Sequence, residues 1–449
     1  MQKKIAFIGA GSLVFTRGVV RDLLTFPAFS DLNIALMDID KERLKWIKQA
    51  VDKIIKAGNY HATVTATTNR REALMNADGV VFTIRVGDMN AVKNDLFIPK
   101  KYGVDLYIGD TRGPGGIFRA LRVLPVLIDI CKDVERYCPK AIVLNYSNPM
   151  AINCRGLQEK FPAMNVTGLC HSVQGTAHQL ADIIGAPMNE ISFLCAGINH
   201  QAWYLKYEWK NEDAYPLIRK AFEKKDIYMK DVVRAEMFRH LGYFMTESSG
   251  HNSEYVPWFR KRRDLINKYC IGPGTNGRSQ VYLKKAIKDL KDGKGDTWKD
   301  DIKEWIKNGK VDLPRGEEYA ACIFNAIFGD NTVLEFNGNV RNFNLIDNLP
   351  YGCCVEVPVT ASKNGFRAMH VGSLPMQLAL INNTNAGCEE LAVRAILDKD
   401  RDSLYYSAYH DPLTSAVLSL GETKNMIDDM IKGAGLGNYF KNYRRGNAR

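Results

Sequence analysis

A cysteine and a histidine thirty positions apart carry side chains that bind transition metals. Cys170 stands in Gly-Leu-Cys-His-Ser-Val, and His200 ends Ala-Gly-Ile-Asn-His. A thiolate and an imidazole can both ligate a divalent transition ion. Each follows an apolar run typical of a strand, at residues 166–169 and 191–198, so the two could converge on one metal. The alternatives are a small buried cysteine and a core or catalytic histidine.

A glycine turn near the amino terminus has the setting of a dinucleotide site. The apolar run of residues 5–8 ends in Gly9-Ala10-Gly11, and a helical pattern follows. Glycine at such a turn lets backbone amides approach a pyrophosphate at the amino terminus of the helix. Val14 stands where the third glycine of the fingerprint is usual, so a simple tight turn is the alternative. The positions expected to bind the cofactor here are Gly9, Gly11, Ser12 and Leu13.

Asp38 adds a second cofactor contact, because it ends the next predicted strand, residues 33–37. A carboxylate at that place hydrogen-bonds the adenosine ribose hydroxyls in dinucleotide-binding folds. It also disfavours a phosphate on the same ribose, so it selects NAD over the phosphorylated cofactor. Gly9, Gly11 and Asp38 together predict an NAD site.

Two further polar positions lie where a substrate could be bound. Asp110 opens the glycine-rich loop 110–116, which is either a flexible connection or a substrate loop. Asn148 lies just beyond a predicted strand, residues 141–146, where its amide can bind the hydroxyls of a sugar or an acid. The alternative for Asn148 is a cap on the helix that begins at Met150.

Tyr255 follows a stretch rich in groups that carry protons, Thr-Glu-Ser-Ser-Gly-His at residues 246–251. Most tyrosines are packing residues with a solvated hydroxyl. Composition alone therefore marks this segment as a candidate catalytic loop and assigns no role within it.

Strands alternate with helices over the first two hundred residues. The predicted strands are residues 5–8, 33–37, 79–84, 141–146 and 166–169. This alternation predicts an α/β fold in which residues 1–200 form a Rossmann-like, parallel-sheet NAD-binding domain. Beyond about residue 205 the pattern becomes a mixture of amphipathic helices and short strands, which we interpret as an α+β carboxyl-terminal domain, residues 201–449. Residues 284–310, dense in lysine and aspartate, indicate a solvated helix and loop.

Composition excludes several classes of protein. The 449 residues are 46% hydrophobic and 25% charged, which is ordinary for a globular chain. The formal charge of +11 is spread along the sequence rather than gathered in blocks, so no nucleic-acid partner is expected. No run approaches the roughly 20 apolar residues of a membrane span. Ten cysteines without a Cys-x-x-Cys pair, and no signal-like segment before the first strand, predict a cytoplasmic protein without structural disulfides.

Taken together, these stretches resemble glycoside hydrolase family four, the NAD- and manganese-dependent glycosidases built on a lactate/malate-dehydrogenase-like fold. The resemblance covers nearly the whole chain. Cys-His-Ser-Val at residues 170–173 looks like the signature of the α-galactosidase (melibiase) branch. The supporting motifs are Asn-Tyr-Ser-Asn-Pro-Met, Cys-Ala-Gly-Ile-Asn-His, Glu-Tyr-Val-Pro-Trp and Leu-Ile-Asp-Asn-Leu-Pro-Tyr-Gly-Cys-Cys-Val-Glu-Val.

The resemblance implies a role for each candidate residue. Cys170 and His200 would bind Mn²⁺, and Asn148 would contact the sugar. Tyr255 would be the base, with Asp110 raising its basicity. In that family NAD takes hydride from the third sugar carbon, a base deprotonates the second, the leaving group departs, water adds and the hydride returns. This scheme is an exception to paired-carboxylate hydrolysis.

One position departs from the family pattern. Some members carry an aspartate directly after the metal-binding cysteine, as the acid for the leaving group, whereas this chain has His171. His171 or another group would then donate that proton.

The expected function is hydrolysis of small α-galactosides such as melibiose. The rivals are an α-glucosidase or α-galacturonidase of the same family, an NAD-dependent hydroxy-acid dehydrogenase and a non-catalytic NAD-binding module. Dehydrogenase-like folds commonly pair, so a homo-oligomer, dimer or tetramer, is expected.

Overall fold

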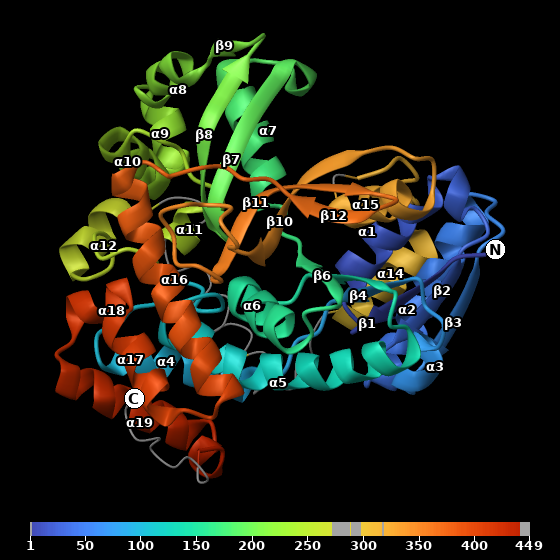
Figure 1. The fold of residues 1–449 in the computed structure, drawn as a ribbon, viewed down its shortest axis with the longest axis horizontal. Coiled ribbons are helices and arrows are strands. Elements are labelled where there is room, and N and C mark those ends of the chain that lie inside the picture. The colour runs from blue at the N-terminus through green and yellow to red at the C-terminus, as the bar shows by residue number, and fades with distance from the viewer. Residues whose placement is uncertain (1, 272–287, 289–297, 317, 441–449) are drawn as a thin grey trace.

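The computed structural model describes residues 2–271, 288, 298–316 and 318–440. Its centre is one mixed sheet, with the strand order β3-β2-β1-β4-β5-β6-β10-β11-β7-β8-β9 and β12 beside β11 (Figure 1). The first six strands in this order are parallel: β1 Lys4–Ile8, β2 Asn33–Met37, β3 Thr63–Thr67, β4 Gly79–Phe82, β5 Ile142–Asn145 and β6 Asn165–Gly168. The others are antiparallel to their neighbours: β7 Ile191–Ile198, β8 Gln201–Trp209, β9 Glu212–Asp213, β10 Leu334–Arg341, β11 Cys354–Ser362 and β12 Gly365–Ala368.

The parallel strands are buried on both faces, because successive side chains of a strand point to opposite sides of the sheet. In β1, Ile5 and Phe7 belong to one apolar core, whereas Ala6 and Ile8 belong to another. All four are 2% exposed or less. Their short apolar runs therefore form central strands.

Two groups of helices cover these two cores. One core is closed by α1 Leu13–Leu24, α2 Lys41–Ala57, α14 Trp298–Asn308 and α15 Tyr319–Phe328. The other is closed by α3 Arg70–Leu74, α4 Met89–Lys101, α5 Gly113–Tyr137, α6 Met150–Lys160, α16 Met376–Leu397, α17 Arg401–His410, α18 Pro412–Val417 and α19 Leu420–Gly433 (Figure 1). The long helix α5 covers one side of this core, and Pro125 within α5 does not end the helix.

A third, smaller layer lies around β7 and β8. Its helices are α7 Ser172–Ile184, α8 Tyr215–Phe222, α9 Lys225–Lys230, α10 Val232–Leu241, α11 Ser249–Asn252 and α12 Arg263–Tyr269. Buried aromatic side chains fill it, among them Tyr204, Tyr207, Phe222 and Phe244. Short 3₁₀ turns complete the chain at Pro27–Phe29, Met188–Glu190 and Leu436–Asn438.

A single pair of residues joins the parallel half of the sheet to the antiparallel half. Asn339 of β10 pairs with Gly168 of β6, and its side-chain amide donates to the Gly168 carbonyl at 3.2 Å. The carbonyl of Asn339 accepts hydrogen bonds from Gln158 at 2.9 Å and Thr167 at 3.2 Å. Side chains thus strengthen a seam that has few backbone bonds.

The expected α/β fold with a Rossmann-like parallel sheet is confirmed. Strand β3 was missed because its threonine-rich sequence is half exposed at the sheet edge and lacks an apolar run. Within 284–310, residues 284–287 and 289–297 lie outside the described residues. The solvated helix expected there exists as α14, but it is not free of the core, since Ile302 is buried. The boundary near residue 200 stays a prediction.

Among the described residues, no helix is both long enough and apolar enough to cross a membrane.

A carboxylate between α6 and α16 makes the fold depend on pH. Partial burial acts to raise the pKa of Glu159, but Arg394 and Arg155 outweigh it and lower that pKa to about 2. Arg394 donates to both carboxylate oxygens at 2.6 Å. A depressed pKa stabilises the fold above the unfolded value, and this contribution is lost as the pH falls through the folded value.

We therefore expect Glu159→Gln to lower the free energy of unfolding at pH 7 by on the order of 2 kcal/mol. The deficit should shrink as the pH falls from about 4.5 towards 2. Urea unfolding between pH 7 and pH 3 measures it. Glu42→Gln, which removes an exposed partner of Lys299, is the control and should change little. A deficit that is constant with pH would contradict this account.

Candidate active site and metal centre

The glycine turn lies at the carboxyl end of β1, against the ends of β2 and β4. Gly9 has a φ of +88°, and a Cβ there would lie 2.9 Å from the backbone nitrogen of Ile84. Its N–H donates to the Met37 carbonyl at 2.9 Å. Helix α1 then begins with no side-chain cap at Ser12, which leaves the amides of its first turn available to a ligand.

Asp38 lies beside this turn, and its carboxylate already accepts hydrogen bonds from backbone N–H groups here, that of Gly11 at 2.7 Å and that of Asp40 at 2.9 Å. Ile39, the next residue, is 89% exposed, and Val14 in the first turn of α1 is 73% exposed. A carboxylate and exposed apolar side chains next to a glycine turn are the groups that the ribose and the flat ring of a dinucleotide require, so these residues fit a dinucleotide.

An aromatic contact connects the glycine turn with the ends of β5 and β6. The ring of Phe15, in the first turn of α1, lies 5.4 Å from that of Tyr146 and 6.2 Å from that of His171. Because parallel strands present their carboxyl ends at one edge, the dinucleotide turn and Cys170 share that edge.

Cys170, His200 and Glu247 form a cluster of donor groups. One ligand atom from each residue lies within 4.8 Å of the others. Cys170 follows β6, and His200 lies in the two-residue turn between β7 and β8. His200 and Glu247 have φ values of +60° and +67°, a left-handed backbone that non-glycine residues seldom adopt. Such strain is typical of functional sites.

The electrostatics of the cluster suit a divalent cation. Burial lowers the pKa of His200 to about 4, so its imidazole is neutral and can ligate. Burial opposes ionisation of Glu247, but His251 and His200 outweigh it and hold the pKa of that carboxyl well below its usual range. Burial, with Glu247 and Glu356 nearby, raises the pKa of the Cys170 thiol. A bound cation would favour the thiolate there, and the sulfur, nitrogen and oxygen donors fit a transition ion.

Tyr255 is fully buried, with its hydroxyl 3.4 Å from Nδ1 of His200. The guanidinium of Arg112 lies over its ring, 4.7 Å from the centroid. Burial and Glu254 raise the pKa of Tyr255 well above its usual value, while Arg112 acts to lower it. The candidate base therefore lies directly against a candidate metal ligand.

Asp110 and Asn148 lie together on the same side. Asp110 accepts hydrogen bonds from Thr111 at 2.8 Å, Arg119 at 3.1 Å and the amide of Asn148 at 3.5 Å. Burial acts to raise the pKa of Asp110, but Arg119 and His251 outweigh it and lower the pKa. The idea that Asn148 caps α6 is wrong, because Pro149 occupies the cap position without a side-chain bond. The Asn148 amide is instead directed to the site.

His171 lies at the edge of this group of site residues. Its side chain is 62% exposed, and Nδ1 is 3.8 Å from a carboxylate oxygen of Glu318. The structure thus brings Cys170, His200 and Tyr255 together, with Asp110 and Asn148 joined beside them, and places His171 outside this group.

Three functional candidates were missed in the sequence. Glu247 was noted only as part of a polar stretch, and His251, four residues on, lies 3.0 Å from its carboxylate. Glu356 is completely buried, and burial together with Glu247 raises its pKa to about 8. A glutamate inside Cys-Cys-Val-Glu-Val-Pro-Val, otherwise an apolar strand, was the signal that could have identified Glu356.

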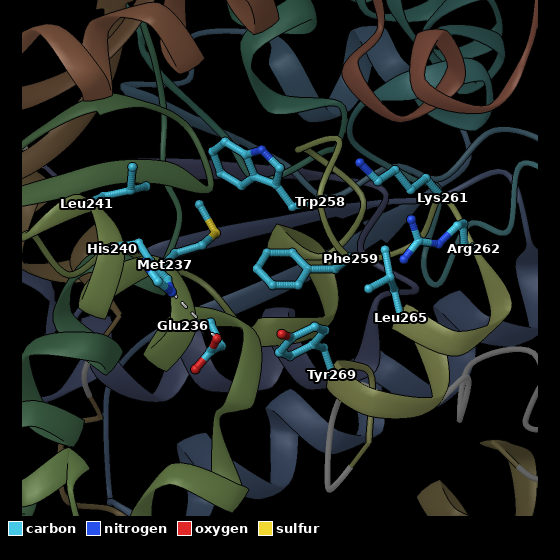
Figure 2. A pocket seen from close by; sticks show the side chains of 10 residues that line it. All are labelled: Glu236, Met237, His240, Leu241, Trp258, Phe259, Lys261, Arg262, Leu265 and Tyr269. Atoms are coloured by element: carbon cyan, nitrogen blue, oxygen red, sulfur yellow. Dashed lines mark ion pairs between the residues drawn. The ribbon is translucent and has the colours of Figure 1, made fainter.

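A separate cavity of about 470 Å³ lies between α10 and α12 (Figure 2). Trp258, Phe259 and Tyr269 form an aromatic wall, and Met237 lies opposite them. None of its lining residues belongs to the cluster around His200.

Comparison with known proteins identifies relatives over nearly the whole chain. Residues 4–186 match the family 4 glycosyl hydrolase model, and residues 195–414 match the model of the family 4 glycosyl hydrolase C-terminal domain. An α-galactosidase of Bacillus subtilis is 37% identical over 96% of this chain and 98% of its own, and one of Rhizobium meliloti is 34% identical over 95% and 87%. Relatives at 29% and 28% identity are named α-galacturonidase and α-glucosidase.

A solved structure has the same fold. It is a 6-phospho-α-glucosidase from gut microorganisms in complex with NAD and Mn²⁺, with a TM-score of 0.76 and 20% identity, covering 96% of this chain and 98% of its own.

Removing one donor from the cluster should weaken metal binding. We expect Glu247→Gln and Cys170→Ser each to lower the affinity for Mn²⁺ by more than about 100-fold, since even partners outside the coordination sphere are worth 10- to 100-fold. Titration calorimetry measures this. Cys322→Ser, at a half-buried cysteine of α15, is the matched control. Unchanged affinity in both donor variants would show that the cluster holds no metal.

Proposed function

Because the chain belongs to the family 4 glycosyl hydrolases, we propose that it is an α-galactosidase that uses NAD and Mn²⁺ to cleave small α-galactosides such as melibiose. One observation carries the proposal: a thiol, an imidazole and a carboxylate converge beside a buried tyrosine hydroxyl. The identity of 37% and 34% to named α-galactosidases supports the galactoside, because the relatives named for other sugars are more distant.

The residues present fit both cofactors. Gly9, Gly11, Ser12, Leu13 and Asp38 would hold NAD, and Cys170, His200 and Glu247 would hold Mn²⁺. When bound, NAD would supply reversible hydride transfer with the sugar, and Mn²⁺ would supply Lewis-acid polarisation of the neighbouring sugar oxygens.

Tyr255 is the base in this proposal. Its hydroxyl would have to lose a proton near neutral pH, although an unperturbed tyrosine has a pKa of about 10 and burial raises it further. Arg112 above the ring favours the phenolate, and a cation held by His200, whose Nδ1 lies 3.4 Å from the Tyr255 hydroxyl, would favour it as well. Complete burial of Tyr255 also keeps water from competing for the proton.

Asn148 and Asp110 orient the sugar. The amide of Asn148 can donate to one sugar oxygen and its carbonyl can accept from another. Asp110, held ionised by Arg119, fixes the amide by accepting one of its hydrogens and has a lone pair to offer a sugar hydroxyl.

Cleavage should depend on both cofactors. We expect the purified protein to release the aglycone of an aryl α-galactoside only with Mn²⁺, NAD and a thiol reductant present. Product made in heavy water should carry deuterium on the second sugar carbon, because Tyr255 exchanges that proton. Aryl α-glucosides and α-galacturonides at matched concentration are the controls. Full activity after removal of metal and cofactor would exclude this mechanism, and net NADH accumulation would indicate a dehydrogenase.

His171 is proposed as the acid for the leaving group, and its rim position fits contact with the aglycone. We expect His171→Ala to slow hydrolysis of melibiose by about 10²- to 10⁴-fold, the usual range for general acid catalysis. An aryl galactoside with an acidic leaving group should be much less affected, because it departs without protonation. His240→Ala, at an exposed histidine beside the separate cavity, is the control. Equal losses on both substrates would assign the proton to another group.

A further inference from the structure

One face of α16 carries three buried polar side chains. Asn382, Asn385 and Glu389 are 0%, 1% and 5% exposed. Their spacing of three and four residues places them on the same face of the helix. Burying amides and a carboxylate is costly unless each is bonded. The hydrogen-bond partners of these three side chains therefore indicate the role of this face of α16.

Each of the three is bonded to a segment that carries a site residue. The amide of Asn382 donates to the Gln201 carbonyl at 3.1 Å, directly after His200. The amide of Asn385 donates to the Tyr255 carbonyl at 3.1 Å and to the Gln201 side chain at 2.9 Å. Glu389 accepts from Nε of Arg112 at 2.8 Å.

Arg112 joins the two segments. Its side chain is 3% exposed. Nη2 donates to the carbonyl of Asn199 at 2.5 Å, the residue before His200. The same guanidinium lies over the ring of Tyr255, 4.7 Å from the centroid. One planar group thus contacts the turn of the metal ligand and the ring of the base.

We propose that Arg112, oriented by Glu389, is a positioning residue that fixes the Tyr255 ring against the His200 turn. The inference rests on the proposed function for the roles of Tyr255 and His200. Arg112 need not touch the substrate for this role. It acts through the two residues that do the chemistry.

The geometry requires an arginine. The fork of a guanidinium can donate to Glu389 and to the Asn199 carbonyl at the same time while its flat face lies on a ring. A lysine ammonium keeps the charge, but as a point charge it cannot make both hydrogen bonds of the fork and the contact with the ring at the same time. Arg112→Lys therefore separates geometry from charge.

The chain offers a matched control in the adjacent glutamate of α16. Glu390 accepts from Nε of Arg155 at 2.5 Å, and the Arg155 side chain is 7% exposed. This pair also joins α16 to another helix, α6, through a nearly buried arginine. Arg155 also pairs with Glu159 of its own helix, and the Glu390 side chain is 27% exposed. Among the described residues, the bonding partners of this pair include neither His200 nor Tyr255, so it measures the cost of losing an ion pair of α16 without an effect on the site.

The test compares Arg112→Lys and Glu389→Gln with Arg155→Lys and Glu390→Gln in the full-length protein. For Arg112→Lys we expect kcat on an aryl α-galactoside to fall by about 100-fold, the typical result of a displacement of about 1 Å. KM should stay within about threefold, because ground-state contacts remain. Affinity for Mn²⁺ alone, without substrate, should fall by about 10- to 100-fold, as for other outer-shell partners. Glu389→Gln should show smaller losses of the same kind.

The control variants should lose a similar amount of thermal stability but keep kcat and Mn²⁺ affinity. An Arg112→Lys protein that matches Arg155→Lys in both kcat and Mn²⁺ affinity would overturn the inference. If Arg112→Lys does not fold, Glu389→Gln against Glu390→Gln decides it by the same measurements. A wild-type protein that cleaves no α-glycoside would refute the proposed function, and the Mn²⁺ titration would still decide the role of Arg112.

Discussion

The site depends on one constraint: a thiol, an imidazole and the carboxyl of Glu356 are buried in one region, beside the partly buried carboxyl of Glu247. Cys170, Glu247 and Glu356 all gain negative charge when they ionise, and water is too scarce there to screen them. Repulsion and desolvation hold the pKa of Glu356 at about 8 and raise that of Cys170. His251, whose pKa rises to about 9 against the effect of burial because Glu247 and Asp110 face it, supplies one compensating charge. A second positive charge, brought by a ligand, would relieve the rest.

The sheet explains how residues that are far apart in the sequence come together at this site. Parallel strands bring the turn after β1 and the ends of β5 and β6 to one edge. The antiparallel strands then place the β7–β8 turn over that edge, where His200 takes a left-handed backbone to direct its ring to Cys170. Glu356 of β11 pairs with Gly197 of β7, so β11 both supports the β7–β8 hairpin and contributes a buried carboxyl group. The candidate site residues and the side chains that orient them therefore come from both halves of the chain.

Local patterns in the sequence predicted what is local in the structure. The apolar runs before Gly9 and Cys170 are central strands, because such runs can be buried on both faces. The convergence of Cys170 with His200 was one of several alternatives, since strand ends alone do not fix which turns face each other. Glu247 could not be chosen over its polar neighbours, because a left-handed backbone and the pairing of nearby Met245 with β8 place it beside His200, and no local pattern shows either. The polar face of α16 was equally hidden, since the partners of Asn382 and Asn385 lie 181 and 130 residues earlier in the sequence.

The pairing of β6 with β10 also determines when a newly synthesised chain can complete its sheet. Gly168 of β6 precedes its partner Asn339 by about 170 residues, and Gly197 of β7 precedes Glu356 by about 160, so each turn that bears the cysteine or the histidine lacks one neighbouring strand while more than a third of the chain is synthesised. At synthesis rates of about 5–20 residues per second, that interval is roughly 10 to 40 seconds. Throughout this period the thiol of Cys170, which is buried in the finished fold, is accessible to oxidants and to other metal ions. The donor cluster around Cys170 and His200 therefore has strands on both sides only after the second half of the sheet has been synthesised.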